Sequence, residues 1–428
     1  MPATAIDLIH RLVEDRREEI VALTQALVRI PTINPPGDAY VPCAELLGDR
    51  LKTRGFAVEY VRGLDSPGDT DAYPRTNVIA RWESGLPGPC VHFNGHIDVV
   101  EVGPGWTTDP FGGEIRDGKV FGRGTCDMKG GIAAAVVAVE ALIDADVPLA
   151  GAIEISGTVD EETGGYGGVA YLAKRGYFSR PRVDHVIIPE PLNVDRVCLG
   201  HRGVWWAEVT THGRIAHGSM PFLGDSAIRH MTAFLEKLEH ELYPKLEKKT
   251  TAMPVVPAGA RQSTLNINSL HGGLGEGHAG FPSAVVAHNC RTVLDRRYLI
   301  EESYDEVRGE IVDLLEALKR QRNDFRYDLK ELFHVPPTLT SADQPVVKAL
   351  AREIERLFGR PAEFICSPGT YDQKHVVRIG NLQDCVAYGP GILDLAHQPD
   401  EYVAIYDLVQ STKVMAVAAH HLLTGAVD

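Results

Sequence analysis

Apolar residues in the first half of the chain follow two spacings, one typical of helices and one typical of buried strands. Between residues 6 and 29 they recur every three or four positions, which predicts an amphipathic helix. Short apolar runs at 57–61, 77–82 and 91–94 predict strands instead. Further helices are predicted at 39–54, 131–145 and 167–175, and further strands at 152–157 and 185–188. Because strands and helices alternate, we expect an α/β domain with a mostly parallel sheet flanked by helices.

The pattern changes near residue 205, where apolar and polar positions begin to alternate. The run Trp206-Ala-Glu-Val-Thr-Thr-His212 is typical of an antiparallel strand with one exposed face. Two more strands of this kind are predicted at 264–269 and 285–296. Helices are predicted before and after these two strands, at 226–239 and 303–321. Together they predict a compact α+β domain inserted into the first one.

The α/β character returns near residue 335, with a helix predicted at 345–358, a strand at 384–388 and a closing helix at 405–423. The predicted fold is therefore α/β, with a discontinuous domain over residues 1–204 and 333–428 and an inserted α+β domain over residues 205–332.

Composition narrows the partners and the compartment. A net charge of −15 argues against nucleic acid and against an acidic membrane surface, since both need a basic face. No apolar run approaches membrane-spanning length. The 7 cysteines include no Cys-x-x-Cys pair, which favours reduced thiols. With no signal-peptide pattern at the N-terminus, we expect a cytoplasmic protein.

The first chemical signal is the pair His96 and Asp98, which follows the apolar run 90–95. A His-x-Asp pair alone equally fits a surface loop or a satisfied core histidine. Here it lies beyond the carboxyl end of a predicted strand, where ligands gather in α/β sheets. Asp98 is well placed to hold the second imidazole nitrogen of His96.

A second signal is Asp127, which lies between Gly122-Arg-Gly-Thr-Cys and Met-Lys-Gly-Gly. One interpretation is a helix N-cap, for which aspartate is well suited. The glycine-rich turn lacks the spacing of a phosphate-binding loop. A carboxylate in a buried turn also suits the bridging of two cations.

Two adjacent carboxylates, Glu161 and Glu162, follow the strand predicted at 152–157. They would repel each other and would be destabilising in a buried position unless cations compensate. The alternative is a solvated acidic loop.

Glu190 lies between two prolines at the end of another strand, and His397 lies in the loop 394–401. Alone, Glu190 would fit a surface turn and His397 an ordinary loop histidine. Taken together at strand ends, these residues favour a metal site.

The ordered motifs identify a family resemblance. They are His96-x-Asp98, Gly-Arg-Gly-x-x-Asp127-Met-Lys-Gly-Gly, Asp-Glu161-Glu162-x-Gly-Gly, Pro-Glu190-Pro and Ala-His397-Gln-Pro-Asp-Glu. This set resembles the co-catalytic metallopeptidase and deacylase family that includes acetylornithine deacetylase, succinyl-diaminopimelate desuccinylase, aminoacylase and glutamate carboxypeptidase. The similarity covers nearly the whole chain.

The resemblance implies two divalent metal ions per chain and a role for each site residue. His96 and Glu190 would hold one ion, Glu162 and His397 the other, and Asp127 would bridge them. Asp98 would orient His96, and Glu161 would be the general base. Histidine and carboxylate ligands without cysteine suit zinc best, with manganese and cobalt as alternatives.

The resemblance also implies that the discontinuous domain is catalytic and that the inserted domain is a lid and a dimerisation domain. His217, which by itself carries no metal signature, would stabilise the oxyanion across a dimer interface. Candidate substrate-binding residues are Asn289, Arg291, Gly369, Thr370 and Asp372. The chain departs from the family pattern at Tyr371, Gln373 and Lys374, around 285–291 and in the glycine-rich stretch 272–283.

The expected function is that of a binuclear-metal hydrolase acting on a small N-acyl amino acid. One alternative is a dipeptidase or carboxypeptidase. Another is an aminohydrolase for a non-peptide substrate such as an aromatic amine, because the departures leave the substrate groups open. A third is an inactive, metal-stabilised binding dimer, against which the intact Glu161 argues. We expect a small-molecule substrate and a homodimer, with a higher homo-oligomer as an alternative.

Overall fold

The computed structural model describes residues 4–273 and 284–425. The chain divides into two compact units. Unit 1 comprises Met1–Gly200, Thr340–Ile365 and Tyr371–Asp428, and unit 2 comprises His201–Leu339 and Cys366–Thr370. The first boundary thus follows residue 200 rather than the predicted 204, and the second follows residue 339 rather than 332. The short segment that joins unit 2 near residue 366 is not anticipated in the sequence.

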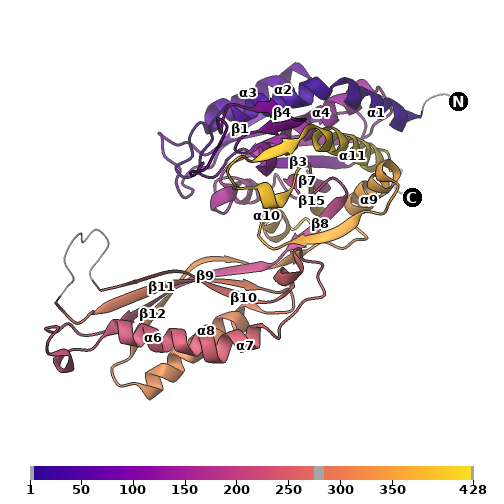
Figure 1. Ribbon diagram of the computed structural model, residues 1–428. Helices are drawn as coiled ribbons and strands as arrows, with labels where there is room; N and C mark the ends of the chain where they lie inside the picture. The colour runs from indigo at the N-terminus through magenta and orange to yellow at the C-terminus, as the bar shows by residue number, and fades with distance from the viewer. Residues whose placement is uncertain (1–3, 274–283, 426–428) are drawn as a thin grey trace. The chain divides into compact units, whose positions relative to one another are not determined.

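Unit 1 is built on a large mixed sheet (Figure 1). Its four central strands run parallel in the order β6 (Ala152–Thr158), β3 (Cys90–His96), β7 (His185–Pro191) and β15 (Cys385–Gly389). On one side β2 (Thr76–Glu83) and β1 (Ala57–Arg62) continue the sheet in antiparallel pairing. On the other side β8 (Arg196–His201) is antiparallel to β15. The predicted parallel sheet therefore describes the centre, and the flanks are antiparallel.

Three short strands and two strands near the unit boundaries complete the set. β4 (Glu114–Arg116), β5 (Lys119–Phe121) and β16 (Tyr402–Ala404) form a small antiparallel sheet, while β13 (Thr338–Leu339) and β14 (Glu363–Ser367) lie near the boundaries in the sequence. The pairing of β5 with β16 joins the chain just before Gly122 to the chain just after Glu401. Two of the sequence motifs are thereby brought together.

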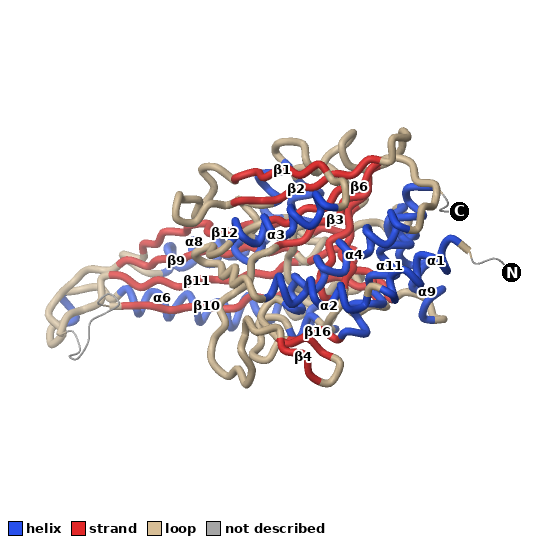
Figure 2. Tube along the Cα trace, turned by 90° about the horizontal axis from the view of Figure 1, so that it is seen from above, coloured by secondary structure: helices blue, strands red, loops and turns tan. Residues whose placement is uncertain are grey.

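The helices of unit 1 are α1 (Ala5–Asp15), α2 (Arg17–Val28), α3 (Tyr40–Thr53), α4 (Gly130–Asp144), α5 (Val169–Ala173), α9 (Pro345–Phe358), α10 (Gln373–Arg378) and α11 (Ile405–Thr424). Helices α1, α4, α9 and α11 lie together beside the central strands (Figures 1 and 2). The Ala- and Val-rich α4 is buried along nearly its whole length, as its composition predicts. The single helix predicted at 6–29 is wrong, because the chain breaks at Arg16, whose ψ of 12° leaves the helical region.

Unit 2 is a four-stranded antiparallel sheet in the order β10-β11-β9-β12. Its strands are β9 (Gly203–His212), β10 (Thr264–Gly272), β11 (Asn289–Tyr298) and β12 (Arg326–Val335). Its helices are α6 (Ala227–Lys237), α7 (Tyr243–Leu246) and α8 (Tyr304–Gln321). Helices α6 and α8 cover one face of this sheet, where Trp205, Phe234 and Leu315 share a buried core (Figure 1).

Two predictions for unit 2 differ from the structure. The strand predicted at 285–296 begins only at Asn289, because the residues before it pair with the segment around His217 instead of continuing the ladder. Strand β12 has no counterpart among the predicted elements; its irregular pairing at Glu331 and Phe333 disturbs the alternation. The glycine-rich stretch 272–283 lies outside the described residues except for its first two positions. Within residues 4–273 and 284–425, no helix combines the length and the apolar character needed to cross a membrane.

Candidate metal centre

Five side chains of unit 1 converge at the carboxyl edge of the central strands. His96 Nε2 lies 3.0 Å from Asp127 Oδ1 and 3.9 Å from Glu190 Oε1. His397 Nε2 lies 3.5 Å from Asp127 Oδ2 and 3.2 Å from the Glu162 carboxylate. The ligand-type atoms within each group of three lie within 4.8 Å of one another. Asp127 therefore belongs to both groups and turns one oxygen toward each.

The parallel arrangement of the strands explains this convergence. His96 is the last residue of β3, and Glu190 lies near the end of the neighbouring β7. Glu162 lies in a short 3-10 turn, Glu161–Thr163, just beyond β6. Because parallel strands end at the same edge of a sheet, these side chains meet there. Asp127 and His397 come from a turn and a loop that the β5–β16 pairing draws to the same edge.

Asp98 lies against His96 and also holds the neighbouring turn. The Nδ1 atom of His96 lies 3.0 Å from the backbone oxygen of Asp98 and 3.6 Å from its carboxylate. The carboxylate also accepts hydrogen bonds from the backbone N–H groups of Glu161 and Glu162, both at 3.2 Å. The side chain of Asn34 donates to the same carboxylate at 2.9 Å. Asp98 thus holds the turn that carries the two adjacent glutamates.

A buried ion pair holds the other side of the site. Arg123 donates to Glu401 at 2.6 Å, and both side chains are buried. The second oxygen of Glu401 accepts from the backbone N–H groups of Cys126 and Asp127, at 2.9 Å and 3.1 Å. Arg123 also donates to the backbone oxygen of His397 at 3.3 Å. This pair therefore fixes the backbone at two candidate ligands that are far apart in the sequence.

The three carboxylates of this site are crowded together in a buried place with only two histidines to offset their charge. Burial raises the pKa of Glu162 to about 7, and the nearby charge of Asp127 contributes to this. Burial and the same charge raise the pKa of Glu190 well above its usual range. Hydrogen bonds to Asp127 and Glu162 raise the pKa of His397 to about 10. Buried carboxylates crowded together in this way are stabilised when bound cations balance their charge.

The donor set fits two divalent cations. It offers two imidazoles and three carboxylates. Asp127 turns one oxygen toward each group of ligands, so each ion would be held by one histidine, one glutamate and one oxygen of Asp127. The nearest cysteine, Cys126, donates to the backbone oxygen of Ile392 at 3.3 Å and takes no part. Nitrogen and oxygen ligands of this kind suit zinc, manganese or cobalt.

Glu161 lies beside the ligand groups without belonging to either. Its Oε1 accepts a 2.6 Å hydrogen bond from Lys374, whose side chain is 1% exposed. Asp372, predicted to bind substrate, is buried and accepts from Asn94 at 3.1 Å. Burial raises the pKa of Asp372 to about 7, with Lys374 acting against and Glu161 adding to this effect.

The remaining predicted residues, His217, Asn289, Arg291, Gly369 and Thr370, belong to unit 2. His217, Asn289 and Arg291 are exposed, and Gly369 and Thr370 are partly exposed. The Nδ1 atom of His217 accepts from the backbone N–H of Ser219 at 3.2 Å, which leaves Nε2 as the protonated nitrogen. Arg291 lies 3.6 Å from Glu208 of the adjacent strand.

Arg123, Glu401 and Lys374 lie inside the sequence motifs, but the sequence predicts no role for them. Arg123 carries a local signal, a charge within a glycine-rich turn, whereas Glu401 and Lys374 lie in polar segments that give none. Tyr371, Gln373 and Lys374, where the chain departs from the family pattern, are all buried. These departures therefore affect the support of the site rather than a surface open to solvent.

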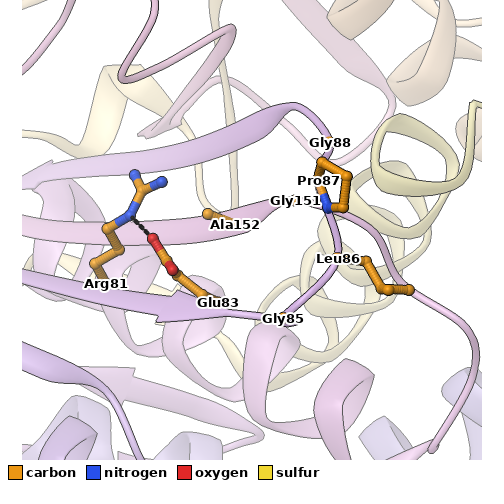
Figure 3. A pocket seen from close by; sticks show the side chains of 8 residues that line it. All are labelled: Arg81, Glu83, Gly85, Leu86, Pro87, Gly88, Gly151 and Ala152. Atoms are coloured by element: carbon orange, nitrogen blue, oxygen red, sulfur yellow. Dashed lines mark hydrogen bonds and ion pairs between the residues drawn. The ribbon is translucent and has the colours of Figure 1, made fainter.

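A surface pocket of about 290 Å³ lies elsewhere in unit 1, between the ends of β2 and β6 (Figure 3). It is lined by Arg81, Glu83, Gly85, Leu86, Pro87, Gly88, Gly151 and Ala152. Its one carboxylate among these described residues, Glu83, is paired with Arg81 at 2.9 Å. This pocket therefore offers no cluster of catalytic or ligand-type groups.

The chain is similar to known proteins over most of its length. The family model of peptidase family M20/M25/M40 matches residues 92–421. A succinyl-diaminopimelate desuccinylase of Methylorubrum extorquens is 30% identical over 403 residues, which cover 92% of this chain and 96% of the relative.

Two solved structures show the same fold. Human carnosine dipeptidase 1 superposes with a TM-score of 0.77 at 18% identity, covering 99% of this chain and 100% of the other. A Bacillus subtilis protein described as a dinuclear metal binding peptidase of the M20 family superposes with a TM-score of 0.68 at 13% identity, covering 96% and 99%.

Proposed function

The chain belongs to peptidase family M20/M25/M40, and from this premise we propose that it is a binuclear-metal amidohydrolase for a small N-acyl amino acid. The family and the desuccinylase relatives make the chain a metal-dependent hydrolase of amide or peptide bonds. The observation that carries the proposal is the position of Asp127. Its two oxygens face two separate histidine–glutamate groups, with Glu161 beside them and outside both.

In this proposal His96, Glu190 and Asp127 would hold one divalent ion, and Glu162, His397 and Asp127 the other. When bound, the two ions would polarise the scissile carbonyl and make a water molecule acidic enough to attack it near neutral pH. Glu161 accepts the proton of that water and delivers it to the leaving nitrogen, so that the C–N bond breaks to a free amine. Asp98 keeps the turn of Glu161 and Glu162 in place through its backbone hydrogen bonds.

Unit 2 has two roles in this proposal. It would pair two chains into a homodimer, and His217 would donate a hydrogen bond to the developing oxyanion. The protonated Nε2 expected from the Ser219 contact supports this role. Asn289, Arg291, Gly369 and Thr370 are its candidate substrate contacts.

An N-acyl amino acid is favoured as the substrate class by the relatives. The desuccinylase of Methylorubrum extorquens shares 30% identity over almost its whole length. The alternative of an aromatic amine rests on the departures from the family pattern at Tyr371, Gln373 and Lys374, around 285–291 and in the stretch 272–283. These departures leave the substrate groups open and do not favour a particular non-peptide substrate.

The test is an assay of chelated protein reloaded with zinc, manganese or cobalt, with N-succinyl and N-acetyl amino acids, dipeptides and aromatic amines as substrates. We expect two ions per chain and hydrolysis of the N-acyl amino acids, and Glu161→Gln should keep both ions while losing at least about 10²-fold in kcat. Full activity of the Glu161→Gln variant would refute the mechanism. Turnover of dipeptides or aromatic amines alone would refute the substrate class, and failure to bind divalent ions would refute the proposal entirely.

A further inference from the structure

A lysine is buried against the proposed general base. Lys374 Nζ donates to Glu161 Oε1 at 2.6 Å, and its side chain is 1% exposed. A fully buried lysine is rare unless it is paired, because removing an ammonium group from water is costly. The partner here, Glu161, stands outside both candidate ligand groups. The lysine therefore contacts a group that takes part in the proposed reaction.

Lys374 projects from a firmly anchored element. It lies in the first turn of α10, where residues 371–376 are all buried. The preceding Gln373 donates to the backbone oxygens of Leu199 and Cys385 at 3.1 Å and 2.6 Å, and it accepts from the Tyr371 hydroxyl at 2.7 Å. These bonds tie the start of α10 to the framework of unit 1, so the base of the lysine side chain has little freedom.

The turn that carries Glu161 is fastened to the same element. His375 Nε2 lies 2.7 Å from the backbone oxygen of Gly164. A Cβ atom added at Gly165 would lie 2.9 Å from Asp372 Oδ1 and 3.0 Å from the ring of His375, so the backbones fit closely. The Lys374–Glu161 bond is thus one of several contacts between α10 and this turn. It is the one that reaches a proposed reacting group.

A second carboxylate adds negative charge beside Lys374. Asp372, the residue just before α10, is buried and is held by Asn94 of β3 at 3.1 Å. Burial lowers the pKa of Lys374, but the charges of Glu161 and Asp372 outweigh this and raise it above its usual value. Lys374 is therefore an ammonium group at neutral pH.

We propose that Lys374 is a positioning residue for hydrolysis: its ammonium group holds one oxygen of Glu161, so that the other is presented to the attacking water. The proposal rests on the proposed function, in which Glu161 is the base. Held at Oε1, the carboxylate keeps Oε2 to accept the proton, and the bond to Lys374 persists in the protonated acid. A general base must lie within hydrogen-bond reach of its proton, and small displacements are costly to the rate. Lys374 need not touch the substrate to act in this way.

The test compares Lys374→Ala and Lys374→Met with wild type, both loaded with two ions per chain. We expect kcat to fall by about 10²-fold with KM changed by less than about threefold, because the lost contact acts on the base and not on substrate binding. Added ethylammonium should restore part of the kcat of Lys374→Ala, whose cavity can admit it. It should not restore Lys374→Met, where the space is filled.

Val376→Ala is the matched control, since Val376 is buried in the same helix and has an apolar side chain. It should lose stability without acquiring amine rescue. If Lys374→Ala and Lys374→Met fail to fold, Lys374→Arg becomes decisive: it keeps the charge but displaces the donor, and kcat should fall by about tenfold.

Wild-type kcat in a folded, loaded Lys374→Ala or Lys374→Met, or in Lys374→Arg where only that variant folds, would overturn the inference. Loss of an ion from these variants would also overturn it, since the defect would then be one of metal retention. Both outcomes leave the proposed function intact as long as Glu161→Gln is inactive. An active Glu161→Gln would instead remove the proposed function itself.

Discussion

The carboxylate of Asp98 accepts a 3.2 Å hydrogen bond from the backbone N–H of Glu161, across 63 residues of sequence. Its other oxygen accepts from the next residue of the same turn at 3.2 Å. A single carboxylate two residues beyond β3 therefore fixes the backbone beyond β6. The geometry of the proposed base and of one proposed ligand depends on it.

We predict that Asp98→Ala lowers both kcat and stability, whereas Asp98→Asn has a smaller effect. Alanine leaves two partly buried N–H groups without an acceptor, at a cost of up to about 1–3 kcal/mol each, while asparagine can still accept from one. Steady-state kinetics and thermal unfolding of the loaded protein measure the two effects. Asp313→Asn, an exposed carboxylate of α8, is the control. Equal losses in the two Asp98 variants would contradict this explanation.

The second prediction concerns Glu401, whose carboxylate joins Arg123 to the backbone at Asp127. Glutamine replaces one carboxylate oxygen with an NH2 group. This donor would face either the guanidinium group of Arg123 or the backbone N–H groups of Cys126 and Asp127. We expect ion affinity to fall by about 10–100-fold, as is typical when outer partners of metal ligands are changed. Competition with a fluorescent chelator measures this affinity. Glu83→Gln, which removes the surface pair with Arg81, should leave it unchanged.

The candidate ligands could be predicted from the sequence because their chemistry is local. His96 and Glu190 each end an apolar run, and a strand of β3 or β7 type places its last residues at one edge of a parallel sheet. Their type and their position in the chain therefore carry most of the signal. The same reasoning predicts the central strands and the largely buried α4.

The supporting residues could not be assigned because their partners are distant in sequence. Lys374 and Glu161 are 213 residues apart, and Arg123 and Glu401 are 278 apart. Which of them meet depends on how α10 and the β5–β16 pair pack, and no local pattern encodes that packing. The break at Arg16 was missed for the opposite reason: the apolar spacing continues through it while the backbone does not.

A third prediction separates backbone strain from close packing at two glycines. Gly165 and Gly55 have φ values of +73° and +83°, so alanine at either position costs about 1–2 kcal/mol in strain. Only Gly165 has a neighbour that a Cβ atom would strike, Asp372 Oδ1 at 2.9 Å. Gly165→Ala should therefore cost about 1–3 kcal/mol more than Gly55→Ala and should also lower kcat, because the Glu161 turn must move. Equal stability and equal kcat in the two variants would show that the Glu161 turn can move away from Asp372 at no cost.

The last prediction concerns the pH dependence of unit 2. The side chain of Glu302 is 7% exposed and accepts from Arg296 at 2.6 Å and Lys249 at 2.8 Å. Burial raises the pKa of Glu302, but these cations outweigh it, so the pKa lies below the usual value of about 4.3. A carboxylate with a lowered pKa in the folded state contributes stability above its unfolded value, and this is lost as pH falls through the folded value. Glu302→Gln should therefore destabilise unit 2 by about 3–5 kcal/mol at pH 7, with the difference from wild type shrinking below about pH 4.

Hydrogen exchange of β11 peptides reports on this unit alone, and Glu236→Gln, at an exposed position, serves as the control. A difference that stays constant down to pH 3 would show that the side chain acts through packing and not through its charge.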